Sequence, residues 1–98
     1  MPAYVIARMK VNDPDGYRRY AEQTPDVVAR YGGRFLVRGG RMTLREGDNS
    51  QLDRTVVVRF DSFEQAQVFY DSPEYQEIAT LRWQAAESEL LIVEGTGD

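Results

Sequence analysis

The chain has 98 residues, of which 42% are hydrophobic, and a formal net charge of −4 at pH 7. This length predicts one domain spanning residues 1–98, with enough apolar side chains for a packed core. The negative charge argues against nucleic acid as a partner, and the absence of His and Cys excludes disulfides and thiolate metal sites.

The first third of the chain predicts a strand followed by a helix. Residues 3–11 alternate between two faces with period two, which is typical of a strand. Asp13 is a suitable helix cap, and Pro14 fits the first helical position because its missing N–H has no partner there anyway. We expect Pro25 to interrupt this helix, with a kink or a restart near Thr24, and Gly32-Gly33 to end it.

The middle of the chain predicts two further strands. Residues 34–38 form the first, and Gly39-Gly40 after them permits a bulge or a sharp bend. Residues 42–44 then resume an extended pattern, and we expect residues 42–45 to reach a partner subunit. Residues 46–50 have the composition of a turn, and residues 54–60 alternate as a strand.

The last third predicts a broken helix and a final strand. Ser62 with Gln65 three residues later is a capping box. Ser72-Pro73 restarts the helix, with Ser72 as a new cap. Residues 89–94 form the last strand, and residues 95–98 are a tail.

The order of these elements, β-α-β-β-α-β, is that of the ferredoxin-like α+β fold. Right-handed crossovers give an antiparallel sheet with strand order 4-1-3-2 and both helices on one face. The opposite face is then expected to carry apolar side chains that water would solvate poorly, namely Tyr4, Ile6, Val57, Leu90 and Ile92. A second copy packed face to face would cover them, so we expect a homodimer.

Nothing in the sequence predicts a membrane protein. No apolar run approaches the roughly 20 residues that span a bilayer, and the first residues begin a strand without the basic and apolar regions of a signal peptide. We therefore expect a cytoplasmic protein without a membrane partner.

Four segments stand out by their order and spacing over nearly the whole chain: Asp13-Pro14 with Tyr17 and Tyr20, residues 32–40, residues 70–76, and Val93-Glu94-Gly95. Together they resemble the domain-of-unknown-function family 1330, of the dimeric alpha-beta barrel superfamily. The resemblance implies a ferredoxin-like protomer in a dimeric barrel and brings no established reaction. Relatives on this fold include cofactor-free monooxygenases of polyketide rings, muconolactone isomerases and stress-induced barrel proteins.

Charged residues expected on the sheet face away from the helices form one candidate site. Arg8, Arg59, Glu94 and, if the register permits, Arg38 belong to it, with Arg59 and Glu94 on either side of Tyr4. Such a group could hold an anionic or enolate-like ligand, with Glu94 as a candidate catalytic carboxylate. The alternative is a structural ion pair at the rim of the dimer.

Tyrosines form the second candidate site. We expect Tyr17, Tyr20, Arg38, Tyr70 and Tyr75 to line a ligand-binding cleft between the helices and the sheet. A phenol can donate to an oxyanion or act as an acid, which makes Tyr20 a candidate catalytic residue. The alternative is that these tyrosines only pack against the sheet.

Two functions follow from these sites. The first is a small dimeric alpha-beta barrel enzyme that uses no cofactor and no metal, an isomerase or a monooxygenase-like proton-transfer enzyme acting on a small anionic or phenolic molecule. The second is a non-catalytic module that binds a small ligand or serves as a stress or accessory protein. The absence of His weakens the first, because a base must then be a perturbed carboxylate or Tyr.

Overall fold

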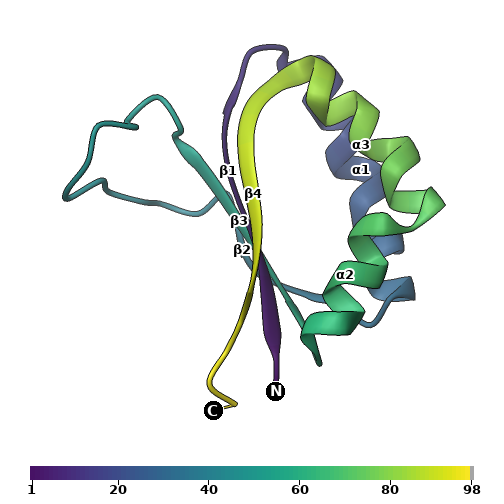
Figure 1. The fold of residues 1–98 in the computed structure, drawn as a ribbon. Helices are drawn as coiled ribbons and strands as arrows, with labels where there is room; N and C mark the ends of the chain where they lie inside the picture. Colours follow the sequence, from purple (N-terminus) through teal and green to yellow (C-terminus); the bar gives the residue numbers. More distant parts are fainter. Residues whose placement is uncertain (98) are drawn as a thin grey trace.

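The protein is a four-stranded sheet with three helices on one face, in a computed structural model that describes residues 1–97 (Figure 1). In chain order the elements are β1 (Ala3–Val11), α1 (Pro14–Arg30), β2 (Arg34–Arg38), β3 (Arg54–Phe60), α2 (Phe63–Asp71), α3 (Pro73–Ala85) and β4 (Ala86–Glu94). The predicted break at Ser72 separates α2 from α3, and the hydroxyl of Ser72 caps α3 by accepting a hydrogen bond from the Tyr75 amide. The ferredoxin-like expectation is confirmed.

The sheet has the order β2-β3-β1-β4, and all neighbouring strands are antiparallel, as predicted. Paired residues of antiparallel strands lie on the same face. Ala7 of β1 is opposite Val56 and Leu90, and Val5 is opposite Val58 and Ile92, so these rows face the helices. Ile6 lies on the outer face, opposite Val57 and Leu91.

An aromatic cluster joins the sheet to the helices. The ring of Phe69 in α2 lies 4.9 Å from the ring of Phe60 in β3 and 4.6 Å from that of Tyr75 in α3, centroid to centroid. All three side chains are buried. Each such ring pair contributes about 0.5–1.5 kcal/mol beyond its buried area, so this cluster fixes the position of α3 over the sheet.

The last strand has a different phase from the predicted one. It begins at Ala86 rather than at residue 89, and its pairing with β1 places Leu90 and Ile92 toward the helices. Leu91 and Val93, which are 47% and 42% exposed, lie on the outer face instead. Residues 90–93 are all apolar, so both faces of this part of the strand are apolar and alternation alone does not determine its phase. The pairing with β1 decides it.

The first helix runs without a break through Pro25, so the expected restart near Thr24 is wrong, whereas the alternative of a kink there stays a prediction. The hydroxyl of Thr24 donates to the carbonyl of Tyr20 at 2.6 Å, within the same helix. The carbonyl that loses its helical donor at Pro25 is that of Ala21, four residues earlier. This carbonyl obtains a replacement donor from Arg38.

The segment between β2 and β3 is a loop that projects to the side of the sheet away from the helices (Figure 1). Gly39, with φ of +73°, follows β2 directly, and residues 42–44 are not a strand, contrary to expectation. The irregularity in strand pairing lies between Phe35 and Val37 rather than at Gly39-Gly40. That residues 42–45 reach a partner subunit remains a prediction.

Gly33 is expected to be intolerant of any side chain. A Cβ at this position would lie 2.7 Å from two ring carbons of the fully buried Phe60 and 2.9 Å from Val28. We therefore expect Gly33→Ala to lower the free energy of unfolding by about 1–3 kcal/mol, the usual cost of overpacking a core. Urea unfolding measures this, with Gly40→Ala as control, because a Cβ at Gly40 meets nothing within 4 Å. Equal stability of the two variants would contradict the prediction.

Candidate functional site

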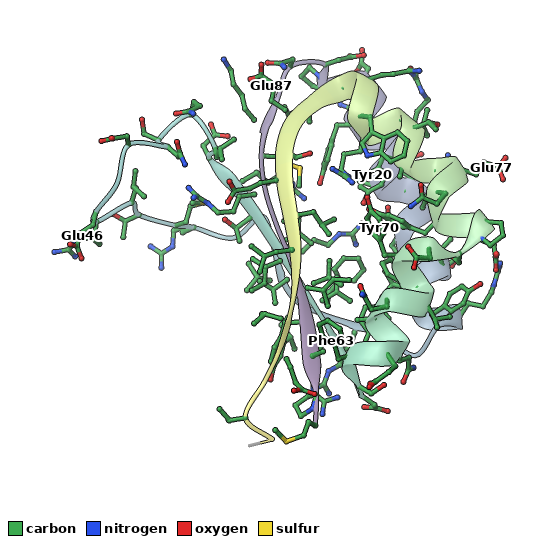
Figure 2. The ribbon with its side chains drawn as sticks, viewed as in Figure 1. Tyr20, Glu46, Phe63, Tyr70, Glu77 and Glu87 are labelled. Carbon is green, nitrogen blue, oxygen red and sulfur yellow. The ribbon has the colours of Figure 1, made fainter. Side chains whose placement is uncertain are left out.

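A cavity of about 30 Å³ lies between α1, α3 and the helix-facing side of the sheet. Its floor is the row of paired residues Val56, Ala7 and Leu90, and its walls carry Tyr17, Tyr20, Tyr75 and Arg38. Figure 2 shows Tyr20 pointing into the space between helices and sheet. Four of the five residues predicted for the cleft thus line one cavity. The space available holds about one or two water molecules.

The hydroxyls of Tyr20 and Tyr75 form a buried hydrogen bond of 2.7 Å between α1 and α3. Each hydroxyl carries one hydrogen, and the mutual bond uses only one of the two. No acceptor for the second hydrogen is found among residues 1–97. The pair therefore has a spare donor beside the cavity. Burial, reinforced by the neighbouring Tyr75, raises the pKa of Tyr20, so Tyr20 stays protonated and able to donate.

Arg82 lies behind this pair and is a site residue that the sequence analysis missed. Its side chain is 3% exposed, and its Nη2 lies 3.5 Å from the Tyr75 hydroxyl. Its guanidinium lies 5.8 Å from the ring of Tyr20, and its Nη1 donates to the hydroxyl of Ser88. Among residues 1–97 no carboxylate pairs with it, and its Nε has no hydrogen-bond partner.

Arg82 remains a cation in this environment. Burial acts to lower the pKa of its guanidinium, but the hydroxyls of Tyr75 and Tyr20 outweigh burial and hold that pKa above its usual value. A buried cation without a counter-ion is costly in free energy. Its positive charge therefore lies beside the Tyr20–Tyr75 pair without a carboxylate to neutralise it among residues 1–97.

A second arginine contacts the tyrosines at the other end of the row. Arg54, which pairs with Met9 on the helix-facing side, donates from Nε to the Tyr17 hydroxyl at 3.0 Å. Its guanidinium lies 5.1 Å from the centre of the Tyr17 ring. The rings of Tyr17 and Tyr20 are 5.6 Å apart. Phenols therefore extend in a row between two guanidinium groups.

Arg38 lines the cavity from β2. It donates from Nη2 to the Ala21 carbonyl at 2.6 Å, and its guanidinium lies 4.6 Å from the ring of Phe35. Because Ala21 has lost its helical donor at Pro25, Arg38 supplies a hydrogen bond that the helix lacks. Its place beside the cavity agrees with the predicted position, and its role as an anion contact remains a proposal.

We expect the stability effects of Pro25 and Arg38 to be coupled. Pro25→Ala restores an N–H for the Ala21 carbonyl, after which Arg38 is no longer needed there. The loss of stability in Arg38→Met should therefore be smaller in the Pro25→Ala background, with a coupling of about 0.5–1.5 kcal/mol. A double-mutant cycle by chemical unfolding measures this term, and additive effects would show that the two residues are independent.

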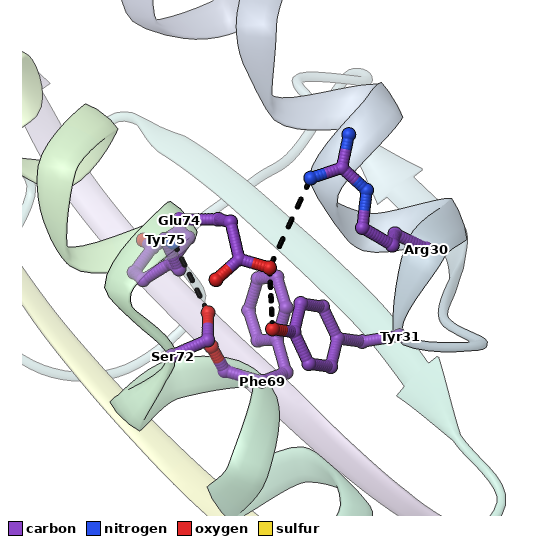
Figure 3. A network of polar contacts seen from close by, with 6 residues as sticks. All are labelled: Arg30, Tyr31, Phe69, Ser72, Glu74 and Tyr75. Atoms are coloured by element: carbon purple, nitrogen blue, oxygen red, sulfur yellow. Dashed lines mark hydrogen bonds and ion pairs between the residues drawn. The ribbon is translucent and has the colours of Figure 1, made fainter.

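A polar network fixes the start of α3 and with it Tyr75 (Figure 3). Ser72 is buried and donates to the Phe69 carbonyl at 2.8 Å, while Glu74 accepts from the Tyr31 hydroxyl at 2.6 Å. Arg30 adds an ion pair to Glu74 at 3.8 Å. The bond from Tyr31 lowers the pKa of the Glu74 carboxyl and raises the pKa of Tyr31 itself. These contacts join the end of α1 to the first turn of α3.

Tyr70, the fifth predicted residue, lies outside the cavity. It lines a groove of about 330 Å³ with Phe63 and Gln67 of α2 and with Leu90 and Ile92 of β4. Its ring is 5.5 Å from the ring of Tyr75. Tyr70 is thus next to the cavity and separated from it by another tyrosine.

The predicted polar cluster of Arg8, Arg59 and Glu94 is not assembled. Arg59 pairs with Asp61 at 2.9 Å, and Arg8 donates to the backbone carbonyls of Asn49 and Leu52. Glu94 lies opposite Ala3 and so points to the other face from Arg59. The error for Glu94 follows from the phase of β4. Arg38 lies opposite Val56, and so on the helix side, because the pairing of β2 with β3 shifts between Phe35 and Val37. Arg8 holds the projecting loop in place.

Acidic side chains are absent from the walls of this cavity, as far as residues 1–97 are described. Within the same part of the chain no group of three or more His, Cys, Asp or Glu side chains is placed to hold a metal ion. None of the described helices is both long enough and apolar enough to cross a membrane. The chemistry of the cavity is therefore that of phenols and guanidinium groups.

Comparison with known protein families finds a match over nearly the whole chain. The profile of a family described as "Domain of unknown function (DUF1330)" matches residues 2–96. No curated protein matches the sequence.

Solved structures with this fold are distant in sequence. A protein of unknown function from Rhodopseudomonas palustris, RPA0582, has a TM-score of 0.74 at 20% identity, over 96% of this chain and 82% of its own. SnoaB, a cofactor-independent oxygenase from Streptomyces nogalater, has a TM-score of 0.65 at 18% identity, over 96% of this chain and 92% of its own. A dimeric ferredoxin-like protein of unknown function from Jannaschia sp. CCS1 has a TM-score of 0.71 at 12% identity, over 97% of this chain and 100% of its own. At these identities the likeness shows the fold.

Proposed function

The chain belongs to the DUF1330 family, and from this premise we propose that it is an enzyme that needs no cofactor and acts on the enolate or phenolate form of a small molecule bound in the cavity. One observation carries the proposal: the Tyr20–Tyr75 pair has a spare hydrogen beside the cavity, and the buried cation Arg82 lies directly behind it. Preorganised donors of this kind stabilise a developing oxyanion.

The charges around the cavity favour an anion over a neutral ligand. The protein as a whole carries a net charge of −4, yet the only charged side chain in the cavity wall is Arg38, among the described residues. Arg82 and Arg54 add positive charge just behind the wall. A carboxylate, phenolate or enolate is therefore attracted to this place.

The same residues support two classes of reaction. Tyr20, with its raised pKa, is an acid and a hydrogen-bond donor rather than a base. Since Glu94 lies at the end of β4 and not in the cavity, the substrate must itself be acidic enough to ionise next to Arg82. The substrate's proton leaves to water, and the bound anion can then take a proton at carbon from the Tyr20 hydroxyl, which is an isomerisation, or react with O₂, which would be the reaction type of SnoaB on the same fold.

A second candidate function is a binding module without catalysis. The observation that favours it is that no Asp or Glu lines the cavity among the described residues, so no carboxylate base lies beside the bound anion. Such a module would hold the same class of anion.

Acetylacetone is a suitable probe, because its enolate absorbs ultraviolet light and it is a small diketone, although it can enter the cavity of about 30 Å³ only if side chains move. We expect the pKa of the bound diketone to fall by about 1–3 units next to Arg82. Arg82→Met should remove this shift, whereas Arg18→Met, an exposed cation on α1, should not. The absence of any shift in the wild type would exclude the proposed site.

Exchange of the α-hydrogens of the same probe in D₂O, followed by NMR, distinguishes the two functions. An enzyme should accelerate the exchange by about 100-fold or more, the usual contribution of a positioned acid or base. Binding with a shifted pKa but without faster exchange would favour the module.

A further inference from the structure

The groove beside the cavity is the larger of the two spaces. It has a volume of about 330 Å³ and lies between α2 and β4, with Phe63, Gln67 and Tyr70 on one side and Leu90 and Ile92 on the other. The cavity has only about 30 Å³. A ligand with more than a few atoms therefore fits the groove better than the cavity.

The groove and the cavity adjoin each other. Leu90 lines both, because its position opposite Ala7 places it in the floor of the cavity and at the edge of the groove. Tyr70 of the groove lies 5.5 Å, ring to ring, from Tyr75 of the cavity. Figure 2 shows Tyr70 on the same side of the sheet as Tyr20. One leucine and one tyrosine thus separate the two spaces.

The side chains of the groove suit a flat, uncharged group. Phe63 and Tyr70 offer aromatic rings, Leu90 and Ile92 offer aliphatic surface, and Gln67 offers one amide. No charged side chain lines it among residues 1–97. The Gln67 amide and the Tyr70 hydroxyl add polar groups, so the groove suits a planar, uncharged body that can also form a hydrogen bond.

We propose that the groove and the cavity are two compartments of one ligand site, with Leu90 as the movable partition. The oxyanion of the ligand lies against the Tyr20–Tyr75 pair, and a planar aromatic or unsaturated body lies in the groove. This inference rests on the proposed function and names its substrate class as an acidic enol or phenol that carries a flat apolar substituent.

Two diketones with the same acidic head test this inference. Benzoylacetone carries a phenyl ring where acetylacetone carries a methyl group. We expect benzoylacetone to bind at least about tenfold more tightly by calorimetry, since even one added methylene in a matching pocket is worth about 10-fold or more. Ile92→Trp should fill the groove, and Phe63→Ala should remove one wall. Each variant should bring the ratio of the two affinities close to one.

Val68→Trp is the matched control, because Val68 lies on α2 but is 57% exposed to solvent and outside the groove. It should keep the wild-type ratio. Two results would overturn the two-compartment site and leave the proposed function standing. In the first, acetylacetone binds in an Arg82-dependent way but benzoylacetone binds no more tightly. In the second, benzoylacetone is preferred, but Ile92→Trp and Phe63→Ala leave this preference intact. Failure of both probes to bind would overturn both.

Discussion

Arg82→Met is expected to make the protein more stable while it abolishes anion binding. Arg82 is buried, has no carboxylate partner among residues 1–97, and leaves its Nε without a hydrogen bond. Methionine has a similar length and no charge to desolvate. Replacing buried charges with apolar groups of similar volume commonly stabilises proteins by about 1–4 kcal/mol, and we expect a gain at the lower end of this range. Replacing a residue that serves function at a cost in stability commonly gives a more stable protein that has lost the function.

Urea unfolding and titration with acetylacetone measure the two effects in the same samples. Arg82→Lys keeps the charge but not the planar guanidinium, so it should bind the diketone more weakly without gaining the stability of the methionine variant. Arg18→Met controls for the loss of a cation on an exposed surface. If Arg82→Met instead unfolds more easily than the wild type, then the bonds to Ser88 and Tyr75 are structural and the argument from unpaired charge is wrong.

Local rules in the sequence predict most of the fold. Asp13 and Ser72 cap helices through side chains that reach backbone amides within the next turn, so their neighbours in sequence are sufficient to identify them. Gly32 ends α1 with φ of +80°, a conformation that favours glycine. The strand order follows from the sequence of elements and the handedness of crossovers.

Features that depend on distant partners are not predicted in this way. The phase of β4 depends on its pairing with β1, because residues 90–93 are apolar on both faces. Pro25 does not break α1 because Arg38, thirteen positions later, supplies a donor to Ala21. Neither contact leaves a periodic signal in the sequence.

The residues of the cavity were predicted only in part from the sequence. Aromatic spacing brings Tyr17, Tyr20 and Tyr75 together as predicted, since each lies on the buried side of its helix. Arg82 was missed although a signal existed. It follows Tyr75, Ile78 and Ala79 at the spacing of one helical face, and all four are buried. An arginine at a core position of a helix indicates a buried charge, and such charges concentrate at functional sites.

The outer face of the sheet remains without a partner in the isolated protomer. One row of paired residues, Val37, Val57, Ile6 and Leu91, crosses all four strands without a polar side chain. Val37 is 40% and Leu91 47% exposed. An apolar row of this kind on a sheet marks an interface. We therefore expect a homodimer whose interface buries at least about 1,200–2,000 Å² in total.

Leu91→Asp is expected to separate this dimer into folded monomers, whereas Leu90→Asp should destabilise each protomer. The two residues are neighbours in β4 but lie on opposite faces, Leu91 beside Ile6 and Leu90 in the floor of the cavity. A carboxylate at Leu91 would be buried without a partner only in the dimer, so dissociation relieves the cost. A carboxylate at Leu90 meets the helix-facing core in either state, at a cost of several kcal/mol.

Light scattering after gel filtration gives the mass of each variant, and urea unfolding gives its free energy of unfolding. A wild type of monomer mass at micromolar concentration would contradict the dimer, and dissociation by Leu90→Asp rather than Leu91→Asp would contradict the register of β4.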